Sequence, residues 1–456
     1  MTETTTVRTD RSRPPLVPGS MIFGSALPLA RDSQAFFVEQ YLRFGPIFRV
    51  RALHRRFTVL AGPEAMTFVT RNGAHFRSHE FWHGLDQEFG AQRSMISTDG
   101  PDHARYRGIE KAGYGRAVIE QRLDEVVSAT VRAVQAWPIG SVHPVHFRLQ
   151  HLVTEQLGRM ISGVSASDSI DDMIHCIRTV LLTRVTRQRP GVWRWLPRYR
   201  RAKARMDRLA QRVLAAQAAR KPGDPPAPLI DALVATSRED PAFLPPGDLP
   251  LAVLGPFFAG LDTVASTAAF VLHALLTRPT LYEQVVAELD PVFAEGPLSA
   301  AALKRLDVLH RTILETMRLY PIAAALSRTV TSPFEFGGHT VESGETVLIA
   351  TTVAHHLPQF YPEPQRFDID RYRPGRSEHQ KPGAFSPYGV GAHTCLGAGF
   401  AEVHLMVLVA TLLHTAELAM DPADYRLRVD PAPTPHPDRG FRMKVVAHRA
   451  AAASRR

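Results

Sequence analysis

The sequence predicts a mainly α-helical protein with a minor β portion. Helical signals run from Asp102 to about Leu319, whereas short runs rich in β-branched and aromatic residues occur before residue 62 and after residue 330. Apolar residues make up 45% of the 456-residue chain and charged residues 21%, as in an ordinary globular protein. This composition excludes a disordered chain, a collagen-like chain and a disulfide scaffold.

The first β signals lie near the N-terminus. Strands are expected at Ile47–Leu53 and Phe57–Leu60, because both runs favour extended backbone. A Gly-Pro turn then leads into a helix at Glu64–Arg71. The segment Phe76–Thr98 contains aromatic residues without a clean period, so we predict a long loop there, and loops of that length are often functional.

The central part of the chain is predicted to be helical. Asp168 is a candidate N-cap of a helix that runs to Leu182. Gln188–Pro197 interrupts the pattern, and a long basic amphipathic helix follows at Arg198–Arg220. Residues 249–277 are almost wholly apolar, so they are expected to form a buried central helix. Shorter helices are expected at residues 229–236 and 306–319.

The β signals return after the helical part. Phe334–Phe336 and His339–Val341 predict a hairpin over a Gly-Gly turn, and Thr346–Ala350 predicts a strand. One last helix begins after Cys395 and runs to about Ala416. The β-containing parts are therefore about residues 20–62, 330–350 and 421–447, and the helical parts about 63–320 and 395–416.

The net charge of +10 comes from one stretch of the chain. Arg184–Arg212 holds ten Arg, one Lys and one Asp, so the remainder is close to neutral. No basic pattern suits a nucleic acid, and we expect none as a partner. Two cysteines in the whole chain favour a reducing cytoplasm. The polar N-terminus resembles no secretory signal, and the apolar runs do not read as membrane anchors.

Cys395 lies in a glycine-rich loop immediately before the last helix. Residues 385–397 read FSPYGVGAHTCLG. A helix N-terminus directs N–H groups and positive dipole at a preceding group, so we expect a lowered pKa for this thiol. The glycines allow close approach of a flat ligand. On spacing alone, Cys395 is a nucleophile, a metal ligand or merely a small buried residue.

Two polar residues interrupt the apolar central helix. Asp262 and Thr263 follow Ala259 and Gly260 in a run whose other members are nearly all hydrophobic. Buried polar groups without partners cost free energy, so both need an explanation. One explanation is structural, with Thr263 bonding back to a helical carbonyl and Asp262 pairing with an arginine. The other is functional, because an acid and an alcohol together can relay protons.

Two further pairs have helical spacing. Glu315 and Arg318 are three residues apart, and His103 and Arg107 are four apart, so each pair shares one helix face. Taken alone, either pair is an ordinary surface feature of small energetic value.

Together these motifs resemble the cytochrome P450 family. The cysteine loop is similar to the family pattern F-x-x-G-x-x-x-C-x-G, with Tyr388 in place of the usual Phe. The resemblance implies a P450-like fold over residues 1–456 as a single catalytic domain, with haem b between the long central helix and the cysteine loop with its last helix. Cys395 would be the axial thiolate of the iron. His393, Gly389, Gly391 and Gly397 match the rest of the haem loop.

The other motifs occur in the order that the resemblance requires. Glu315 and Arg318 match E-x-x-R, and Glu315 stands 80 residues before Cys395, as in the family. Arg371 is the candidate third member of that structural cluster. Ala259, Asp262 and Thr263 match the oxygen-activation motif of the central helix, where acid, alcohol and water deliver protons for O–O cleavage. Candidates for binding the haem propionates are His103, Arg107, Arg328 and His393.

The implied activity is haem-thiolate monooxygenation of an apolar molecule such as a lipid, terpenoid, steroid or natural-product intermediate. No reductase domain is expected in the chain, so electrons would come from NAD(P)H through a ferredoxin or flavodoxin with its reductase. A non-oxygenase haem-thiolate protein (isomerase, dehydratase or sensor) stays open, as does a peroxide-driven variant. The expected substrate pocket is lined by Phe81, Trp82, Leu85, Phe89, Gly255, Phe258, Ala259, Ile322 and Ala323.

The basic stretch Arg184–Arg212 falls where the family has the lid over its pocket. It reads as a solvated arginine face, as a contact with an anionic membrane surface, or as a docking site for an acidic carrier protein that presents a tethered substrate. The sequence does not decide between these three interpretations.

Overall fold

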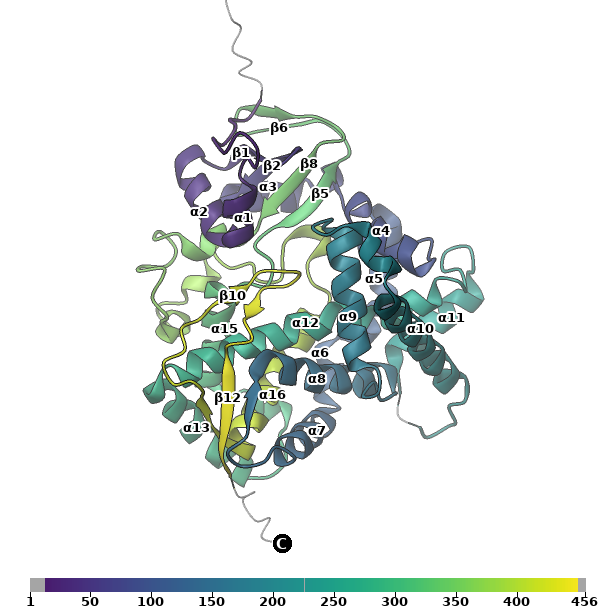
Figure 1. Cartoon of the computed structure of the whole chain (residues 1–456), viewed down its shortest axis with the longest axis vertical. Coiled ribbons are helices and arrows are strands. Elements are labelled where there is room, and N and C mark those ends of the chain that lie inside the picture. The colour runs from purple at the N-terminus through teal and green to yellow at the C-terminus, as the bar shows by residue number, and fades with distance from the viewer. Residues whose placement is uncertain (1–12, 225, 450–456) are drawn as a thin grey trace, which may run out of the picture. The chain divides into compact units, whose positions relative to one another are not determined.

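The computed structural model describes residues 13–224 and 226–449. The polar N-terminus, on which the absence of a secretory signal was argued, lies mostly outside these residues. The described chain falls into two compact units, each assembled from segments distant in sequence. The first unit holds the sheet and the loop before Cys395, and the second holds most of the helices and Cys395 itself (Figure 1). The predicted β-containing parts at about 20–62 and 330–350 lie in the first unit, whereas the predicted part at about 421–447 lies in the second.

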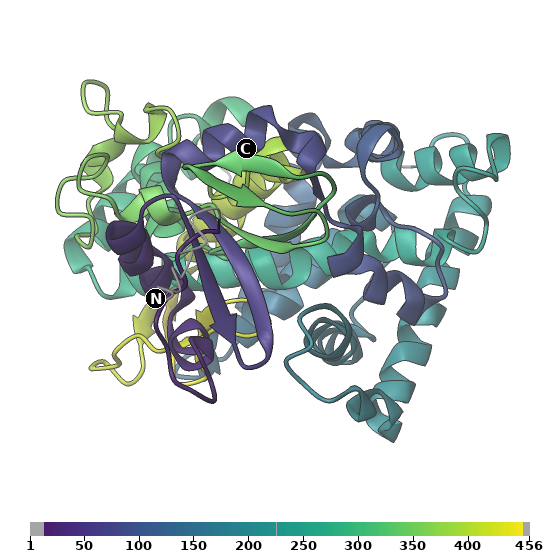
Figure 2. The same cartoon turned by 90° about the horizontal axis from the view of Figure 1, so that it is seen from above.

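The first unit is organised on a five-stranded sheet in the order β1-β2-β8-β5-β3. The β1–β2 pair is an antiparallel hairpin, and β2 pairs with β8 in parallel, joining segments almost 290 residues apart (Figure 2). Its elements are α1 Ala26–Arg31, α2 Ser33–Phe44, β1 Ile47–Ala52, β2 Arg55–Ala61, α3 Gly62–Arg71, η1 Gly73–His75, β3 Phe76–Arg77, β5 Leu326–Val330, β6 Phe334–Phe336, β7 His339–Val341, β8 Thr346–Ala350, η6 Val353–His356 and η9 Gly391–His393.

The second unit is helical, with two small sheets and single turns between its helices. The three-stranded sheet has the order β4-β12-β9 and the two-stranded one joins β10 to β11. Its elements are α4 His79–Phe89 (whose first residues belong to the first unit), η2 Met95–Ser97, α5 Gly100–Tyr114, α6 Arg116–Glu120, α7 Leu123–Gln135, β4 Val142–Pro144, α8 Val145–Leu157, η3 Gly158–Ser162, α9 Ile170–Val180, η4 Leu181–Val185, η5 Gly191–Trp195, α10 Pro197–Ala218, α11 Pro228–Glu239, α12 Leu249–Leu276, α13 Pro279–Ala294, α14 Ala300–Leu303, α15 Asp307–Leu319, η7 Ile369–Tyr372, α16 Ala398–Thr415, β9 Ala416–Met420, β10 Val429–Asp430, β11 His436–Pro437 and β12 Arg442–His448, with η8 Glu378–Gln380 at the boundary.

The long helix α12 is the core of the second unit. It packs against α8, α15 and α16, and most of its side chains are buried, as its apolar sequence predicts. A Cβ atom at Gly260 would lie 2.6 Å from Cδ1 of Leu157 on α8, so glycine permits the close approach of these two helices. The hydrogen bond between Gln150 on α8 and Asp262 on α12 depends on this close approach.

Three local predictions were wrong. The predicted loop Phe76–Thr98 contains the helix α4, in which Gly84 and Leu85 are buried while polar and aromatic residues alternate on the other sides, so no period was visible. Asp168 does not cap the next helix: α9 begins after Ser169, and the Asp168 carboxylate binds Arg212 instead. In addition, the strand-rich start of the chain contains the helices α1 and α2.

Within the described part of the chain, two helical stretches are long and apolar enough to cross a membrane, Leu249–Leu276 and Gly391–Thr415. Their most apolar windows are 78% and 67% buried inside the protein. Both are therefore accounted for as core helices.

Candidate functional site

Cys395 lies three residues before α16, with its side chain accessible to solvent. Burial of the surrounding loop raises the pKa of the thiol, while the backbone N–H of Gly397 and the charge of Arg107 act in the opposite direction. The predicted lowering by the helix terminus is present, but it is smaller than the effect of burial, so the predicted direction of the pKa shift was wrong. Stabilising the thiolate therefore requires a further positive group, such as a metal ion.

Tyr114, the last residue of α5, connects the cysteine loop with α12. Its ring lies 3.6 Å from where a Cβ atom of Gly397 would be, and its hydroxyl lies 3.9 Å from the corresponding position at Gly255. Burial, with the nearby charges of Glu110 and Cys395, raises its pKa well above the ordinary value. The Tyr114 side chain thus lies beside Gly397 of the cysteine loop at its ring and beside Gly255 of α12 at its hydroxyl.

The helix α5 also carries the two predicted propionate ligands of the second unit. His103 is buried, whereas Arg107 is partly exposed and close enough to Cys395 to lower the thiol pKa. Within residues 13–224 and 226–449, no carboxylate forms an ion pair with Arg107. Its guanidinium is therefore available for an anionic group beside the cysteine.

The helix α12 presents a short open strip in an otherwise buried surface. Ala259 is exposed and Thr263, one turn later, is partly exposed, whereas Asp262 is only 5% exposed. The Thr263 hydroxyl donates a 2.7 Å hydrogen bond to the Ala259 carbonyl oxygen. Small residues and a hydroxyl thus line one side of the helix, and the acid points to another.

Asp262 is directed at α8. Its Oδ1 accepts a 2.5 Å hydrogen bond from Nε2 of Gln150. Burial raises the pKa of the carboxyl, and the Gln150 bond with the charges of Arg178 and His436 partly offsets that rise. The partner foreseen for Asp262 was an arginine, but the direct partner is a glutamine, and its identity depends on the long-range packing of α8 on α12.

The predicted structural cluster is formed and fully buried. Nε and Nη2 of Arg318 each donate a 2.8 Å hydrogen bond to the Glu315 carboxylate, and both side chains are 0% exposed. Nε of Arg371 lies 3.4 Å from Oε1 of the same carboxylate. This burial distinguishes the pair from the ordinary exposed helix pair that its spacing alone also allowed.

Three partners of this cluster were missed by the sequence argument. The Tyr372 hydroxyl donates to Oε2 of Glu315 at 3.0 Å, and the Asp368 backbone N–H donates to Oε1 at 2.9 Å. Nη1 of Arg371 binds Glu378 at 2.9 Å. A tyrosine next to Arg371 was a visible signal, whereas Glu378 has no pattern that points to it.

The predicted haem-loop residues before Cys395 belong to the first unit. Gly389 and Gly391 have φ values of +79° and +74°, a left-handed conformation that favours glycine. Nε2 of His393 lies 3.1 Å from the Ser78 hydroxyl. Arg328 is 8% exposed on β5, and one of its donors binds the neighbouring Ser327 carbonyl at 2.7 Å. Tyr388 is half-buried in the same loop.

The predicted pocket residues differ in their surroundings. Phe89 and Phe258 form an edge-to-face pair with centroids 5.3 Å apart. Leu85 is 2% exposed and belongs to the core of α4, so it packs rather than lines an open space. Accessible surface is present at six others, whose place in a pocket stays a prediction: Phe81, Trp82, Gly255, Ala259, Ile322 and Ala323.

The basic stretch is partly neutralised by internal ion pairs. Glu88 on α4 accepts hydrogen bonds from Nε of Arg184 at 3.0 Å, Nη1 of Arg194 at 2.6 Å and the Tyr199 hydroxyl at 2.8 Å. These bonds lower the pKa of Glu88 against the raising effect of burial. Between them Trp195 is 74% exposed. One carboxylate therefore fastens α4 to three segments of the basic stretch.

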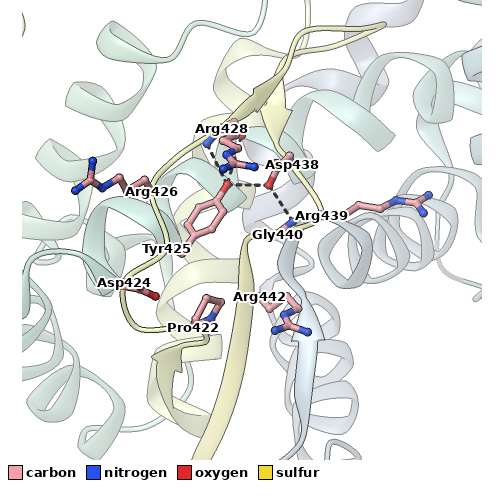
Figure 3. Close-up of a pocket in the computed structure, with 9 residues that line it drawn as sticks. All are labelled: Pro422, Asp424, Tyr425, Arg426, Arg428, Asp438, Arg439, Gly440 and Arg442. Carbon is pink, nitrogen blue, oxygen red and sulfur yellow. Dashed lines mark hydrogen bonds between the residues drawn. The ribbon is translucent and has the colours of Figure 1, made fainter.

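An open pocket of about 550 Å³ lies elsewhere, among the C-terminal loops (Figure 3). The Tyr425 hydroxyl donates to Oδ1 of Asp438 at 3.0 Å, and the Gly440 N–H donates to the same oxygen at 2.8 Å. None of the predicted site residues lines this pocket. We assign no chemistry to it.

The residues present fit a haem. A thiol with accessible surface, an arginine without an acidic partner and an open strip of small residues on α12 belong to one unit. Among the described residues, no group of three His, Cys, Asp or Glu side chains is arranged to hold a metal ion. An iron that takes most of its ligands from a macrocycle and one from Cys395 matches this donor set.

Comparisons with known proteins agree with this geometry. The sequence profile described as Cytochrome P450 matches residues 14–440. A cyclooctat-9-en-7-ol 5-monooxygenase of Streptomyces melanosporofaciens is 27% identical over 405 residues, which cover 87% of each chain. A putative cytochrome P450 139 of Mycobacterium tuberculosis is 27% identical over 387 residues, covering 82% of this chain and 89% of that protein.

The fold is shared with solved structures. A retinoic-acid-bound cyanobacterial CYP120A1 superposes with a TM-score of 0.82 at 20% identity, covering 96% of this chain and 99% of that one. The chain therefore belongs to the cytochrome P450 family. It is a P450 oxidoreductase, and its named relatives include monooxygenases. The predicted family and the predicted mainly α fold are confirmed.

Proposed function

We propose that the protein is a haem-thiolate monooxygenase, acting as a single catalytic domain, that inserts one oxygen atom from O2 into an apolar small molecule. The observation that carries this proposal is the accessible thiol of Cys395 in the same unit as the open strip of α12 around Ala259. Bound haem supplies the redox-active iron at which O2 is reduced. The second oxygen atom leaves as water, which requires two electrons and two protons.

Each predicted residue has a role in this proposal. Cys395 would hold the haem iron through its thiolate, and Arg107 would bind a haem propionate. His103, Arg328 and His393 are further propionate ligands by resemblance. The buried cluster of Glu315, Arg318 and Arg371 is structural, because its charges are used up on one another. The side of the haem that faces the thiolate would be shaped by Gly389, Gly391 and Gly397 and by the half-buried Tyr388.

Proton delivery is assigned to Asp262 and Thr263. Burial raises the pKa of the Asp262 carboxyl, which favours its protonated form and suits a proton donor. Thr263 is partly exposed on the open strip, so its hydroxyl can position a water molecule there. Asp262 is turned towards α8, so a water molecule or a rotation of its side chain must connect the two groups.

The substrate is proposed to be apolar. The aromatic pair of Phe89 and Phe258 and the small residues Ala259 and Ala323 offer hydrophobic surface without an acidic group. The relative named cyclooctat-9-en-7-ol 5-monooxygenase acts, by its name, on a cyclic alkenol. A terpenoid, steroid or other lipid-like natural product is therefore the proposed substrate class.

Electrons are proposed to come from NAD(P)H through a ferredoxin or flavodoxin with its reductase in the cytoplasm. A Cβ atom at Gly399, four residues after Cys395, would lie 3.6 Å from the Arg116 side chain. Exposed Lys111 lies near the end of α5, and Arg116 at the start of α6 also pairs with Glu120. The positive charge of Lys111 suits an acidic electron carrier.

A Soret titration of the purified ferric protein tests the proposed function. Free fatty acids, terpenes, steroids and macrolides are added first, and then an acidic carrier protein loaded with acyl groups. An apolar ligand that displaces axial water should convert the iron from low to high spin. A response to the loaded carrier alone would move the substrate to a tethered form and make Arg184–Arg212 its docking site. A purified protein without any haem band would contradict the proposal.

A further inference from the structure

A ladder of polar pairs joins α8 to α12 in the buried interior of the second unit. Gln150 binds Asp262 at 2.5 Å, and His146 binds Ser266 through Nε2 and Oγ at 3.1 Å. The partners are four residues apart on each helix and run in opposite directions, so both pairs lie on one contact face. The buried acid thus lies one helical turn from a buried histidine of the facing helix.

A second histidine extends this ladder towards the surface. The ring of His436 on β11 stacks on the ring of His146, with centroids 4.0 Å apart and an interplanar angle of 26°. Asp430 on β10 is the cross-strand partner of His436, and its Oδ2 lies 3.8 Å from Nε2 of that ring. The Asp430 side chain is 46% exposed. The row of polar groups therefore begins at solvent and ends at Asp262.

Hydrogen bonding orients the ring of His436. Nδ1 lies 2.8 Å from the Thr434 carbonyl oxygen, which only accepts, so Nδ1 carries a proton. Nε2 is then the nitrogen that faces Asp430. His146 stays neutral, because burial and the charges of His436 and Arg178 hold its pKa well below the ordinary value. Of the two stacked rings, His436 is the one that lies beside a carboxylate.

From this arrangement we propose that His436, together with Asp430, is the solvent-side station through which Asp262 regains protons during turnover. The inference rests on the proposed monooxygenase function and deepens it. When Asp262 releases a proton towards the Thr263 side, its carboxylate takes one back through water hydrogen-bonded in the ladder. Nε2 of His436 supplies that proton and recovers its own from solvent at Asp430. One proton enters for each one delivered, and no redox step is involved.

The other groups around Asp262 define how the ladder responds to pH. Nη2 of Arg178 on α9 donates to the Ala432 carbonyl at 2.8 Å and lies 3.8 Å from Oδ2 of Asp430. Gln150 occupies Oδ1 of Asp262, which leaves Oδ2 to carry the proton. A charged His436 lowers the pKa of Asp262, as Arg178 does. Asp262 therefore releases its proton more readily whenever His436 is protonated.

The first test reads the Asp262 proton itself rather than activity. Infrared spectra of the holoprotein are recorded against pH, and the Asp262→Asn variant identifies the protonated carboxyl band. His436→Phe keeps an aromatic ring against His146 but removes the exchangeable proton. The midpoint of the Asp262 band should move to higher pH in His436→Phe. An unchanged midpoint would contradict coupling between the two groups. His448→Phe is the matched control, because its ring binds the Trp137 carbonyl instead, and it should leave the midpoint unchanged.

The second test is a double-mutant cycle on product formed per electron pair. His436→Phe should lower this ratio by about tenfold, less than the ~10²-fold or more that a positioned proton-transfer group itself contributes. The solvent deuterium isotope effect should increase, and the spectral dissociation constant of the substrate should not change. In the Asp262→Asn background His436→Phe should add no further loss. Asp430→Asn, a surface change, should reproduce the loss in part.

The outcomes distinguish the proposed role of His436 from the proposed monooxygenase function. Full coupling in His436→Phe and Asp430→Asn, with Asp262→Asn impaired, would overturn the role of His436 alone. An equal loss from His436→Phe in both backgrounds would also overturn it, because the two groups would then act independently. Full coupling in Asp262→Asn itself would contradict the assignment of proton delivery to Asp262. A wild-type protein that consumes electrons without forming any oxygenated product would contradict the proposed function on which the inference rests.

Discussion

Arg318 binds Glu315 by two parallel hydrogen bonds of 2.8 Å, and neither side chain has any exposed surface. Two charges can be held in such an interior only because each satisfies the other and Arg371 and Tyr372 complete the set. The cluster joins α15 to the η7 segment. Its loss therefore affects the folding of the unit that contains Cys395.

Glu315→Gln should destabilise the protein by roughly 3–5 kcal/mol, because it leaves Arg318 buried with an unbalanced charge. The purified variant should contain little haem and should melt at lower temperature. The exposed pair of Glu295 and Arg305 provides the control, and Glu295→Gln should change neither quantity measurably. Normal haem content and thermal stability in Glu315→Gln would contradict the structural role.

Thr263→Ala should separate electron consumption from product formation. Without the Thr263 hydroxyl on the open strip, proton delivery is no longer directed, and hydrogen peroxide is released in place of product. Product per electron pair should fall by about 10²-fold or more, as expected for removal of a proton-transfer group. Thr267→Ala is the matched control one turn later, where the hydroxyl binds the Thr263 carbonyl at 2.9 Å. Equal uncoupling in both variants would show that the effect is not specific to Thr263.

Glu88→Gln should loosen the basic stretch. It weakens the bonds to Arg184, Arg194 and Tyr199 together, so ligand association and dissociation should both become faster in stopped-flow spectroscopy. The folded-state pKa of Glu88 is lowered, so these bonds stabilise the protein above its ordinary pKa and are lost as the pH falls through the lowered value. Wild-type exchange rates should therefore rise towards those of the variant only in acid. Rates that do not depend on the substitution would contradict the fastening role.

Glu110 should make the protein less stable as the pH rises. Burial raises the pKa of this carboxyl from 4.5 to about 8, so the unfolded chain ionises before the folded one does. Stability should fall by on the order of 1 kcal/mol per pH unit between those two values and level off above the higher one. Glu110→Gln should remove this slope and raise the melting temperature more at pH 8 than at pH 5. Parallel pH profiles for variant and wild type would exclude the effect.

The local motifs of the site could be read from the sequence because their spacing is short. Glu315 with Arg318 and His103 with Arg107 lie on single helices, and the glycines before Cys395 mark a loop whose left-handed backbone follows from residue type. The strands Phe57–Leu60 and Thr346–Ala350 were predicted separately. Their parallel pairing was not, because no local pattern encodes contact between distant segments.

The parts that were missed depend on tertiary packing. Gln150 is an ordinary residue of an amphipathic helix until α8 meets α12 and places it on Asp262. His436 lies in a proline-rich tail whose path along the helices has no sequence signal. The pKa of Cys395 was predicted in the wrong direction, because the burial of its loop is a property of the folded unit.

The spectrum of the reduced carbon monoxide complex, compared between wild type and Cys395→Ser, tests the central claim most directly. Cys176→Ser serves as the control, because Cys176 is the other cysteine in the chain and is buried in α9. The wild type and Cys176→Ser should show the Soret band of a thiolate-ligated haem, and Cys395→Ser should lose it. A thiolate-type band that persists in Cys395→Ser would contradict the assignment of Cys395 as the iron ligand.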